Sequence, residues 1–397
     1  MRVYSAPDEE RIRDASLVRE WASSGLLDSA QSAALQAELI TELRQTNGFL
    51  RAVFFFFTAL ISVAGVALCA VTIRPHEGAE WAVLFVASGL ACWLLAEVAC
   101  RKRLYRYGIE EALAVISVVL ISIGVANMFS ISGRWEEVAG LVTASVGALA
   151  VYFRFGFVYA AVASLVVAAG IPFQFDTGIE EKRLASAIVF ALTLVFVRQS
   201  RKQSDESSVS ALAAVESASW LGAYFMLNIQ LATTFFLLPT WIFYSPYSSS
   251  APALATWFFP FSWVMIWLLP AAGLWLGLAR KDRLLIDVSL AMTLLTLTTN
   301  KRYLGWAVHE WDPMILGAVL MTTAIVIRRW LQNGPNRERN GYTAVRLLSS
   351  DERKLATVSI ASSLMQPRPS HATSANEPHD FREGGGSSGG GGASGNF

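Results

Sequence analysis

The feature that most constrains this chain is a run of apolar segments from Val53 to about Trp330, separated by short polar connections. The core of a bilayer is about 30 Å thick, and a helix that rises 1.5 Å per residue crosses it with roughly 20 apolar residues. Lipid offers peptide groups no hydrogen-bonding partner, so each spanning segment must be an α-helix. Only 16% of the residues are charged, against about 25% in a typical soluble domain. The pattern therefore predicts an all-α, multi-pass integral membrane protein.

About ten segments have the composition expected of a membrane span. They are Val53–Ile73, Trp81–Ala99, Ala112–Ile131, Val138–Phe153, Phe155–Phe173, Leu184–Val197, Trp220–Tyr244, Trp257–Ala279, Leu284–Thr299 and Met314–Trp330. The segments 138–153, 184–197 and 284–299 are short for a bilayer. We expect them to extend further, to thin the membrane or to be broken helices. Arg154 alone separates the fourth segment from the fifth, which predicts a very tight turn or a snorkelling arginine.

Lysine and arginine are enriched in cytoplasmic loops, so their distribution predicts the orientation of the chain. The even-numbered loops hold eleven: Arg101, Lys102, Arg103, Arg106, Arg154, Arg198, Arg201, Lys202, Arg280, Lys281 and Arg283. The odd-numbered loops hold six: Arg74, Arg134, Lys182, Arg183, Lys301 and Arg302. This bias predicts that both termini are cytoplasmic. The polar first 48 residues contain no apolar signal core, so we expect the first span to direct insertion.

The region before the first span predicts a small cytoplasmic helical hairpin. Residues 1–13 are polar and are expected to be loose, whereas 14–24 carries an approximate apolar face that predicts a helix. Gly25 is a stop signal for that helix.

The second helix of the hairpin begins with a capping signal. Asp28 is followed by Gln31 three residues on, which is the capping-box spacing, and the apolar spacing predicts a helix to about Thr46. A hairpin this small has little core of its own. We expect it to pack on the membrane domain or, through residues 14–46, on a cytoplasmic protein partner.

The hairpin also carries a resemblance to known proteins. Its sequence reads Leu17-Val18-Arg19-Glu20-Trp21 and then Gly25-Leu26-Leu27-Asp28-Ser29-Ala30-Gln31, ahead of a helix and membrane spans. In this it resembles a group of prokaryotic multi-pass membrane proteins whose N-terminal region is a domain of unknown function, so a bacterial inner membrane is the implied location. The resemblance implies no activity and no catalytic residues. A core anchor at Trp21 and a helix stop at Gly25 explain both residues without any function.

Behind the last span the chain becomes polar. Ser350 is placed to cap a helix from Asp351 to about Met365, and from Pro367 the glycine- and serine-rich composition predicts disorder. Similar glycine-rich tails that end in an aromatic residue occur in several bacterial membrane proteins. The predicted domains are a cytoplasmic hairpin (1–48), a transmembrane domain (49–331), a cytoplasmic linker with a short helix (332–366) and a disordered tail (367–397).

Polar side chains inside the predicted spans form a candidate intramembrane site, because ionisable groups in a bilayer are costly and usually functional. The candidates are Glu97, Asn127, Asn228, Gln230 and Asp287. Glu97 lies four residues before Arg101, and Asp287 lies four residues after Arg283, so local ion pairing is one interpretation. An ion- or proton-coupling site is the other. Hydrogen bonding between helices explains the three amides equally well.

The seventh and eighth spans are rich in proline and aromatic residues. Pro239, Pro260 and Pro270 are predicted helix breaks, and the stretch also contains Trp241 and Tyr244. Proline inside a helix frees carbonyls that can line a cavity, so this is the predicted solute pathway. Kinked helices joined by an interfacial aromatic belt are the alternative.

The ninth connection is a candidate extracytoplasmic loop site. It holds Lys301, Arg302, His309 and Glu310, which include groups able to bind an anion or act as acid and base. Asp312-Pro313 matches an N-cap followed by proline in the first turn, which explains that pair without a function. This loop also resembles the end of the same prokaryotic membrane proteins, where a lysine–tyrosine–leucine–glycine and tryptophan–aspartate–proline layout precedes the last span.

Three functional hypotheses follow. The first is transport or sensing of a small solute, and the second is a membrane scaffold that recruits partners through its hairpin and tail. The third, an intramembrane enzyme centred on the ninth loop, has no recognisable catalytic motif to support it. With three cysteines, four histidines and a net charge of +1, the sequence supports no metal site, no cofactor and no nucleic-acid partner. It leaves the oligomeric state open.

Overall fold

The structure is a computed structural model that describes residues 3–23, 25–44, 46–129, 133–201, 206–234, 257–305, 309, 311–334, 338–339 and 342–343. The compact unit Met1–Val345 contains all of them. The described part is mainly helical, with one short antiparallel pair, β1 (Glu338–Arg339) and β2 (Tyr342–Thr343), and an isolated parallel bridge between Arg44 and Leu104. The predicted helix 351–365 and the predicted tail lie outside the described residues.

The N-terminal hairpin consists of α1 (Ala6–Ser23) and α2 (Ser29–Glu38). Gly25 separates them with φ +73°, and the N–H of Leu26 donates to the carbonyl of Trp21 at 2.9 Å, so the predicted stop is confirmed. The predicted capping box is confirmed too, because Asp28 and Gln31 each accept a backbone N–H across the start of α2.

Two predictions about the hairpin were wrong. Residues 1–13 are not loose, because α1 already begins at Ala6 and Tyr4 is buried with 5% of its surface exposed. Composition alone cannot predict that these residues are ordered, because Tyr4 packs against residues that are far from it in the sequence. The second helix also ends at Glu38, well before Thr46.

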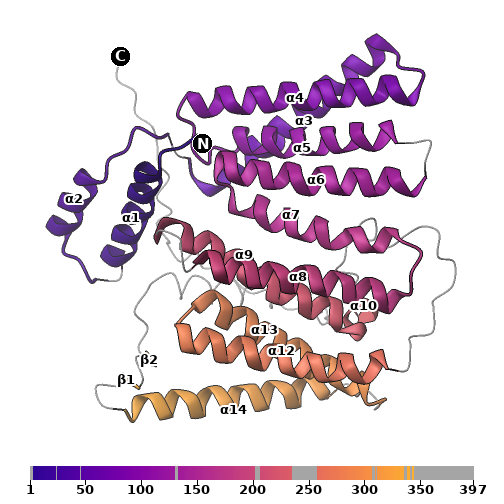
Figure 1. The fold of residues 1–397 in the computed structure, drawn as a ribbon. Helices are drawn as coiled ribbons and strands as arrows, with labels where there is room; N and C mark the ends of the chain where they lie inside the picture. The colour runs from indigo at the N-terminus through magenta and orange to yellow at the C-terminus, as the bar shows by residue number, and fades with distance from the viewer. Residues whose placement is uncertain are drawn as a thin grey trace, which may run out of the picture. The chain divides into compact units, whose positions relative to one another are not determined.

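Over their described residues, the ten predicted apolar segments coincide with helices, which run side by side and alternate in direction (Figure 1). The helices are α3 (Gly48–Ile73), α4 (Gly78–Arg101), α5 (Ile109–Met128), α6 (Arg134–Phe155), α7 (Val158–Gly170) with a 3-10 turn η2 (Ile171–Gln174), α8 (Ile179–Arg201), α9 (Glu206–Leu227) with α10 (Ile229–Thr234), α12 (Phe258–Arg280), α13 (Arg283–Tyr303) and α14 (Asp312–Gln332). The three short segments extend into helices of 22, 23 and 21 residues, because charged residues continue them past their apolar parts.

Seven described helices are long and apolar enough to cross a membrane: α3, α4, α5, α6, α8, α12 and α14. The α7–η2 segment and the apolar part of α9 are shorter, and α13 does not reach the same hydropathy. The chain therefore has the architecture of a multi-pass integral membrane protein. Seven described helices meet this criterion of length and hydropathy, fewer than the ten spans predicted from the sequence.

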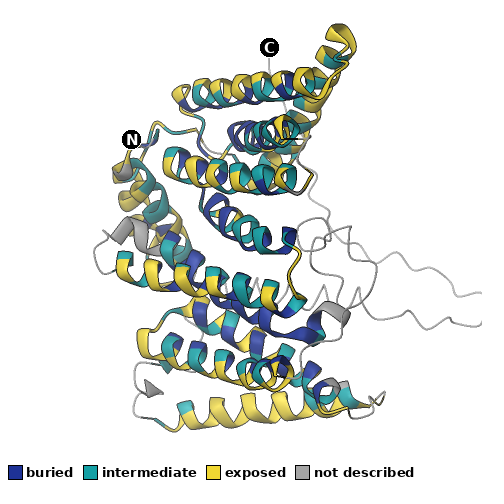
Figure 2. Cartoon of the chain, turned by 45° about the vertical axis from the view of Figure 1, so that its right-hand side comes forward, coloured by how far each residue is buried: buried dark blue, intermediate teal, exposed yellow. Residues whose placement is uncertain are grey.

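The outer helices expose apolar surface that lipid would cover. The apolar windows of α3 and α14 contain no buried residue, and Figure 2 shows α14 exposed over most of its length. Inner faces pack closely through small residues, as is common between membrane helices. At Gly124 of α5 an added Cβ would lie 2.9 Å from the carbonyl oxygen of Ala82 in α4. Larger side chains at this contact would therefore separate α4 from α5.

Two hydrophobic clusters organise the helices. One joins α4, α5, α6 and the start of α7 with Tyr4, and the other joins α7, α8, α9, α12 and α13. We call the end of the bundle at which the hairpin lies the hairpin end, and the opposite end the far end (Figure 1). The N–H of Val3 donates to Arg154 O at 2.9 Å, and the Tyr4 hydroxyl donates to Leu104 O at 2.6 Å. These bonds attach the start of the chain to the hairpin end.

Candidate functional site at the break in α9

The seventh apolar segment is a discontinuous helix. The helix α9 ends at Leu227 and α10 begins at Ile229, with the fully buried Asn228 between them. A helix break was predicted in this segment, but at Pro239, which lies outside the described residues. A break inside a membrane leaves backbone groups that lipid cannot satisfy, so the surrounding helices must supply their partners.

Side chains from three neighbouring helices supply partners to the backbone at this break. Arg183 of α8 donates from Nη1 to Met226 O at 3.3 Å, and Ser262 of α12 donates to Leu227 O at 2.7 Å. Tyr303 of α13 accepts the N–H of Ile229 at 2.8 Å. These contacts compensate for the interrupted helical hydrogen bonding.

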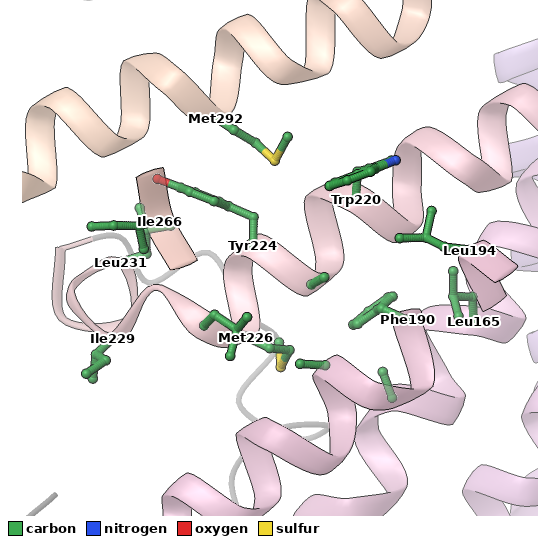
Figure 3. Close-up of a cluster of buried hydrophobic side chains, with 14 of the residues drawn as sticks. Leu165, Phe190, Leu194, Trp220, Tyr224, Met226, Ile229, Leu231, Ile266 and Met292 are labelled. Atoms are coloured by element: carbon green, nitrogen blue, oxygen red, sulfur yellow. The ribbon is translucent and has the colours of Figure 1, made fainter. Parts of the chain in front are cut away.

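The side chain of Asn228 begins a chain of hydrogen bonds across the core. Its amide nitrogen donates to the hydroxyls of Tyr224 at 2.9 Å and Thr299 at 3.1 Å. Tyr224 lies 2.8 Å from Thr296, whose hydroxyl donates to Ile266 O at 2.7 Å, so Tyr224 must be the donor to Thr296. Figure 3 shows Tyr224 reaching from α9 toward Ile266 of α12. All these groups have partners, which makes this network a strong tie between helices.

The hydrogen bond from Thr296 to Ile266 O has a specific cause in the sequence. Pro270 lies inside α12 and has no N–H, so it cannot donate to the carbonyl of Ile266 four residues before it. Thr296 of α13 satisfies that same carbonyl at 2.7 Å. The predicted helix break at Pro270 is wrong, because α12 continues without interruption from Phe258 to Arg280. The proline nevertheless leaves the carbonyl of Ile266 free, and a hydroxyl from the next helix binds it.

Arg183 is the group at this site with unused binding capacity. A guanidinium carries five N–H donors, and the contact to Met226 O uses one. The side chain is half-buried, and among the described residues no carboxylate pairs with it. An arginine that contacts a broken helix and forms no ion pair among the described residues is a candidate for binding an anion, although Glu180 and Glu181 precede it in the first turn of α8.

The structure brings together only part of the predicted intramembrane site. Asn228 and Gln230 lie at the break, where the N–H of Gln230 donates to Asn228 Oδ1 at 3.2 Å. Asn127 donates to its own helix, to Ile123 O at 2.8 Å, and Asp287 is exposed on α13. Pro260 lies in the first turn of α12, where no backbone donor is needed.

The local partner predicted for Glu97 was wrong. Glu97 forms a two-bond ion pair with Arg154 of α6, whose Nη2 lies 2.7 Å from Glu97 Oε2. The predicted Arg101 is on the same helix, but helix packing places Arg154 closer. The tight turn predicted at Arg154 is present immediately after it, where Gly156 ends α6 with φ +77°.

The candidate loop site is partly described. Lys301 lies 2.5 Å from Asp312, and the N–H of His309 donates to the same carboxylate at 2.9 Å. The hydrogen bond from Lys301 lowers the pKa of Asp312. Asp312 is thus the first residue of α14 and binds Lys301, instead of capping the helix as predicted. The side chains of Arg302 and Glu310 lie outside the described residues.

Sequence reasoning missed a charged cluster at the hairpin end of α9. Glu216, with 1% of its side chain exposed, accepts from Arg280 at 3.1 Å, from Arg198 at 3.4 Å and from Arg201. Asp282 also binds Arg201, at 3.1 Å. From the sequence, these arginines are interpreted as loop charges. The signal that could have revealed the cluster is Glu216, an isolated acid within an alanine-rich run.

Comparison of the chain with protein-family models, with curated proteins and with solved structures gives no match. The fold and the site define the class, a helical multi-pass membrane protein with a polar core at a broken helix. Among the described residues, no group of histidine, cysteine or acidic side chains is arranged to hold a metal ion.

Proposed function

We propose that this protein binds a small solute at the break in α9 and transports or senses it, and that Arg183 recognises an anionic group of that solute. The observation that carries the proposal is a guanidinium with unused donors beside an interrupted helix. Transporters commonly bind solutes where membrane helices are broken, because unwound backbone is tolerated where it lines a site.

The proposal includes an orientation. We propose ten spans in a bacterial inner membrane, with the hairpin end cytoplasmic and the far end extracytoplasmic. The basic loops 101–106 and 280–283 support this, because both lie at the hairpin end of the bundle. Arg183 is the fifth residue of α8, which starts at the far end. The solute would then reach Arg183 from the extracytoplasmic side.

Charged thiol reagents test the proposal without knowledge of the solute. After replacement of Cys69, Cys92 and Cys100, we would introduce Thr299→Cys and compare two methanethiosulfonates of opposite charge. We expect the anionic sulfonatoethyl reagent to react faster than the cationic trimethylammonium-ethyl reagent. Arg183→Gln should lower the ratio of the anionic to the cationic rate, because it removes the positive charge.

Matched variants complete this experiment. Lys182→Gln removes a neighbouring charge on the same helix turn and should leave the preference unchanged. Leu290→Cys places a thiol on the exposed face of α13 and should react slowly with both polar reagents, because lipid covers it. A Thr299→Cys thiol that reacts with neither reagent would mean a dry core and would refute the solute site.

A scaffold role is the second candidate, favoured by exposed apolar side chains on the hairpin. Leu17, Trp21, Leu26 and Leu35 are between 36% and 57% exposed, so Trp21 is not the core anchor that was predicted. Trp21→Ser with Leu26→Ser should remove specific co-purifying proteins and leave the buried contact of Tyr4 intact. An unchanged set of co-purifying proteins would leave the hairpin as a structural cap.

A further inference from the structure

A polar cavity lies where the hairpin meets the membrane helices. It measures about 440 Å³, which is within the size range of small-molecule sites. Its walls come from α1, from the start of α3, from the α4–α5 turn and from Gly156 after α6. Segments far apart in the sequence thus enclose one space beside the bundle, separate from the break in α9.

The charged lining of this cavity is predominantly basic. It contains four arginines and two glutamates, and the arginines are Arg13, Arg19, Arg51 and Arg106. Arg13 and Arg51 have acidic partners, since Arg13 lies 3.5 Å from Glu10 and Arg51 Nε lies 2.6 Å from Glu111. In the described part of the chain, no carboxylate forms an ion pair with Arg19 or Arg106. Among the described residues, the cavity therefore offers two guanidinium groups without an ion-pair partner, in a lining that also contains the carboxylate of Glu9.

The wall that carries Arg106 is held in an unusual backbone conformation. Arg106 has φ +51°, a left-handed conformation that side chains other than glycine rarely adopt, and its guanidinium lies 5.5 Å from the centre of the Tyr105 ring. The same turn is held close to α3, because a Cβ on Gly108 would lie 2.2 Å from Arg51 O. Backbone strain of this kind persists where the surroundings fix it, and it is frequent at binding sites.

We propose that this cavity binds a phosphate group, presented either by a small phosphorylated molecule or by the head group of an anionic lipid. Guanidinium groups bind phosphate oxygens in pairs of hydrogen bonds, and Arg19 of α1 and Arg106 of the α4–α5 turn both line the cavity. A phosphate between them ties α1 to the α4–α5 turn. The site thereby regulates how firmly the hairpin is attached to the bundle.

The experiment uses the full chain in nanodiscs of phosphatidylcholine, titrated calorimetrically with inorganic pyrophosphate. We expect binding by the unmodified protein and at least a tenfold loss of affinity in the double variant Arg19→Gln, Arg106→Gln. The matched control is Arg11→Gln with Arg103→Gln, which alters the same helix and the same turn but not the lining of the cavity. This control should bind like the unmodified protein.

The source of the phosphate is decided in a second arm. If a lipid head group is the ligand, nanodiscs that contain phosphatidylglycerol should protect the amides of α1 from hydrogen exchange. This protection should occur in the control variant but not in the double variant. Protection by pyrophosphate and not by this lipid identifies a soluble ligand. Equal behaviour of the double variant and the control in both arms overturns the proposal.

One further variant separates loss of binding from loss of folding. Arg106→Gly relieves the left-handed conformation, so it should raise the thermal midpoint slightly while still weakening pyrophosphate binding. Unchanged binding in this variant contradicts the proposal. Arg183→Gln should leave pyrophosphate binding unchanged, so failure of the solute proposal and failure of this one are distinguishable.

Discussion

The helix α9 carries two polar clusters that follow different rules. At the hairpin end, Glu216 is surrounded by three arginines, and Asp282 adds a second carboxylate. Twelve residues further, about 18 Å along the helix, Asn228 is surrounded by hydroxyls. The first cluster consists of full charges whose arginines are 18% to 40% exposed, whereas Asn228, Tyr224 and Thr296 are uncharged and buried.

The difference follows from the solvent that each cluster meets. A partly exposed arginine can keep part of its guanidinium hydrated, so a charged cluster is tolerated there. Deeper in the bundle a charge would lose its hydration, and neutral hydrogen bonds join the helices at much lower cost. Arg183 departs from this rule, since it is a charge placed beside the neutral cluster. That exception makes it the strongest candidate for a functional residue.

The largest predicted effect concerns the charged cluster. Glu216→Gln leaves three arginines without their shared counter-charge, so the free energy of unfolding should fall by about 3 kcal/mol. Asp282→Asn, which removes a carboxylate whose one ion pair among the described residues is with Arg201, should cost about 1 kcal/mol or less. Unfolding titrations with dodecyl sulfate in mixed micelles measure both values. Equal losses would mean that the arginines do not depend on Glu216.

An intermediate effect is expected at the neutral cluster. Asn228→Ala removes the hydrogen bonds to Tyr224, Thr299 and Gln230, at roughly 0.6 kcal/mol each in a membrane protein, for about 2 kcal/mol in total. Added salt should weaken the charged cluster and should leave the cost of Asn228→Ala unchanged, because no ion pair is lost. A salt-dependent cost for Asn228→Ala would erase the proposed distinction between the two clusters.

The two clusters also show what a sequence can predict. Segment positions, the Asp28 capping box and the role of Gly25 depend on residues within a few positions of one another, and sequence patterns specify these well. The partner of Glu97 and the meeting of Tyr224 with Thr296 depend on which helices become neighbours. No local pattern encodes that choice. Asn228 and Pro270 were identified from their residue types, while Arg183 was interpreted as a loop charge because α8 extends past its apolar part.

The smallest predicted effect tests the link between Pro270 and Thr296. Thr296→Val removes the donor to Ile266 O and should cost about 1 kcal/mol. In a Pro270→Ala background the alanine N–H can donate to Ile266 O, so the same Thr296→Val change should cost less. We expect the two changes to couple by about 0.5 kcal/mol or more in a double-mutant cycle of unfolding free energies. Additive costs would mean that another group satisfies the carbonyl, and that the neutral cluster does not compensate for the proline.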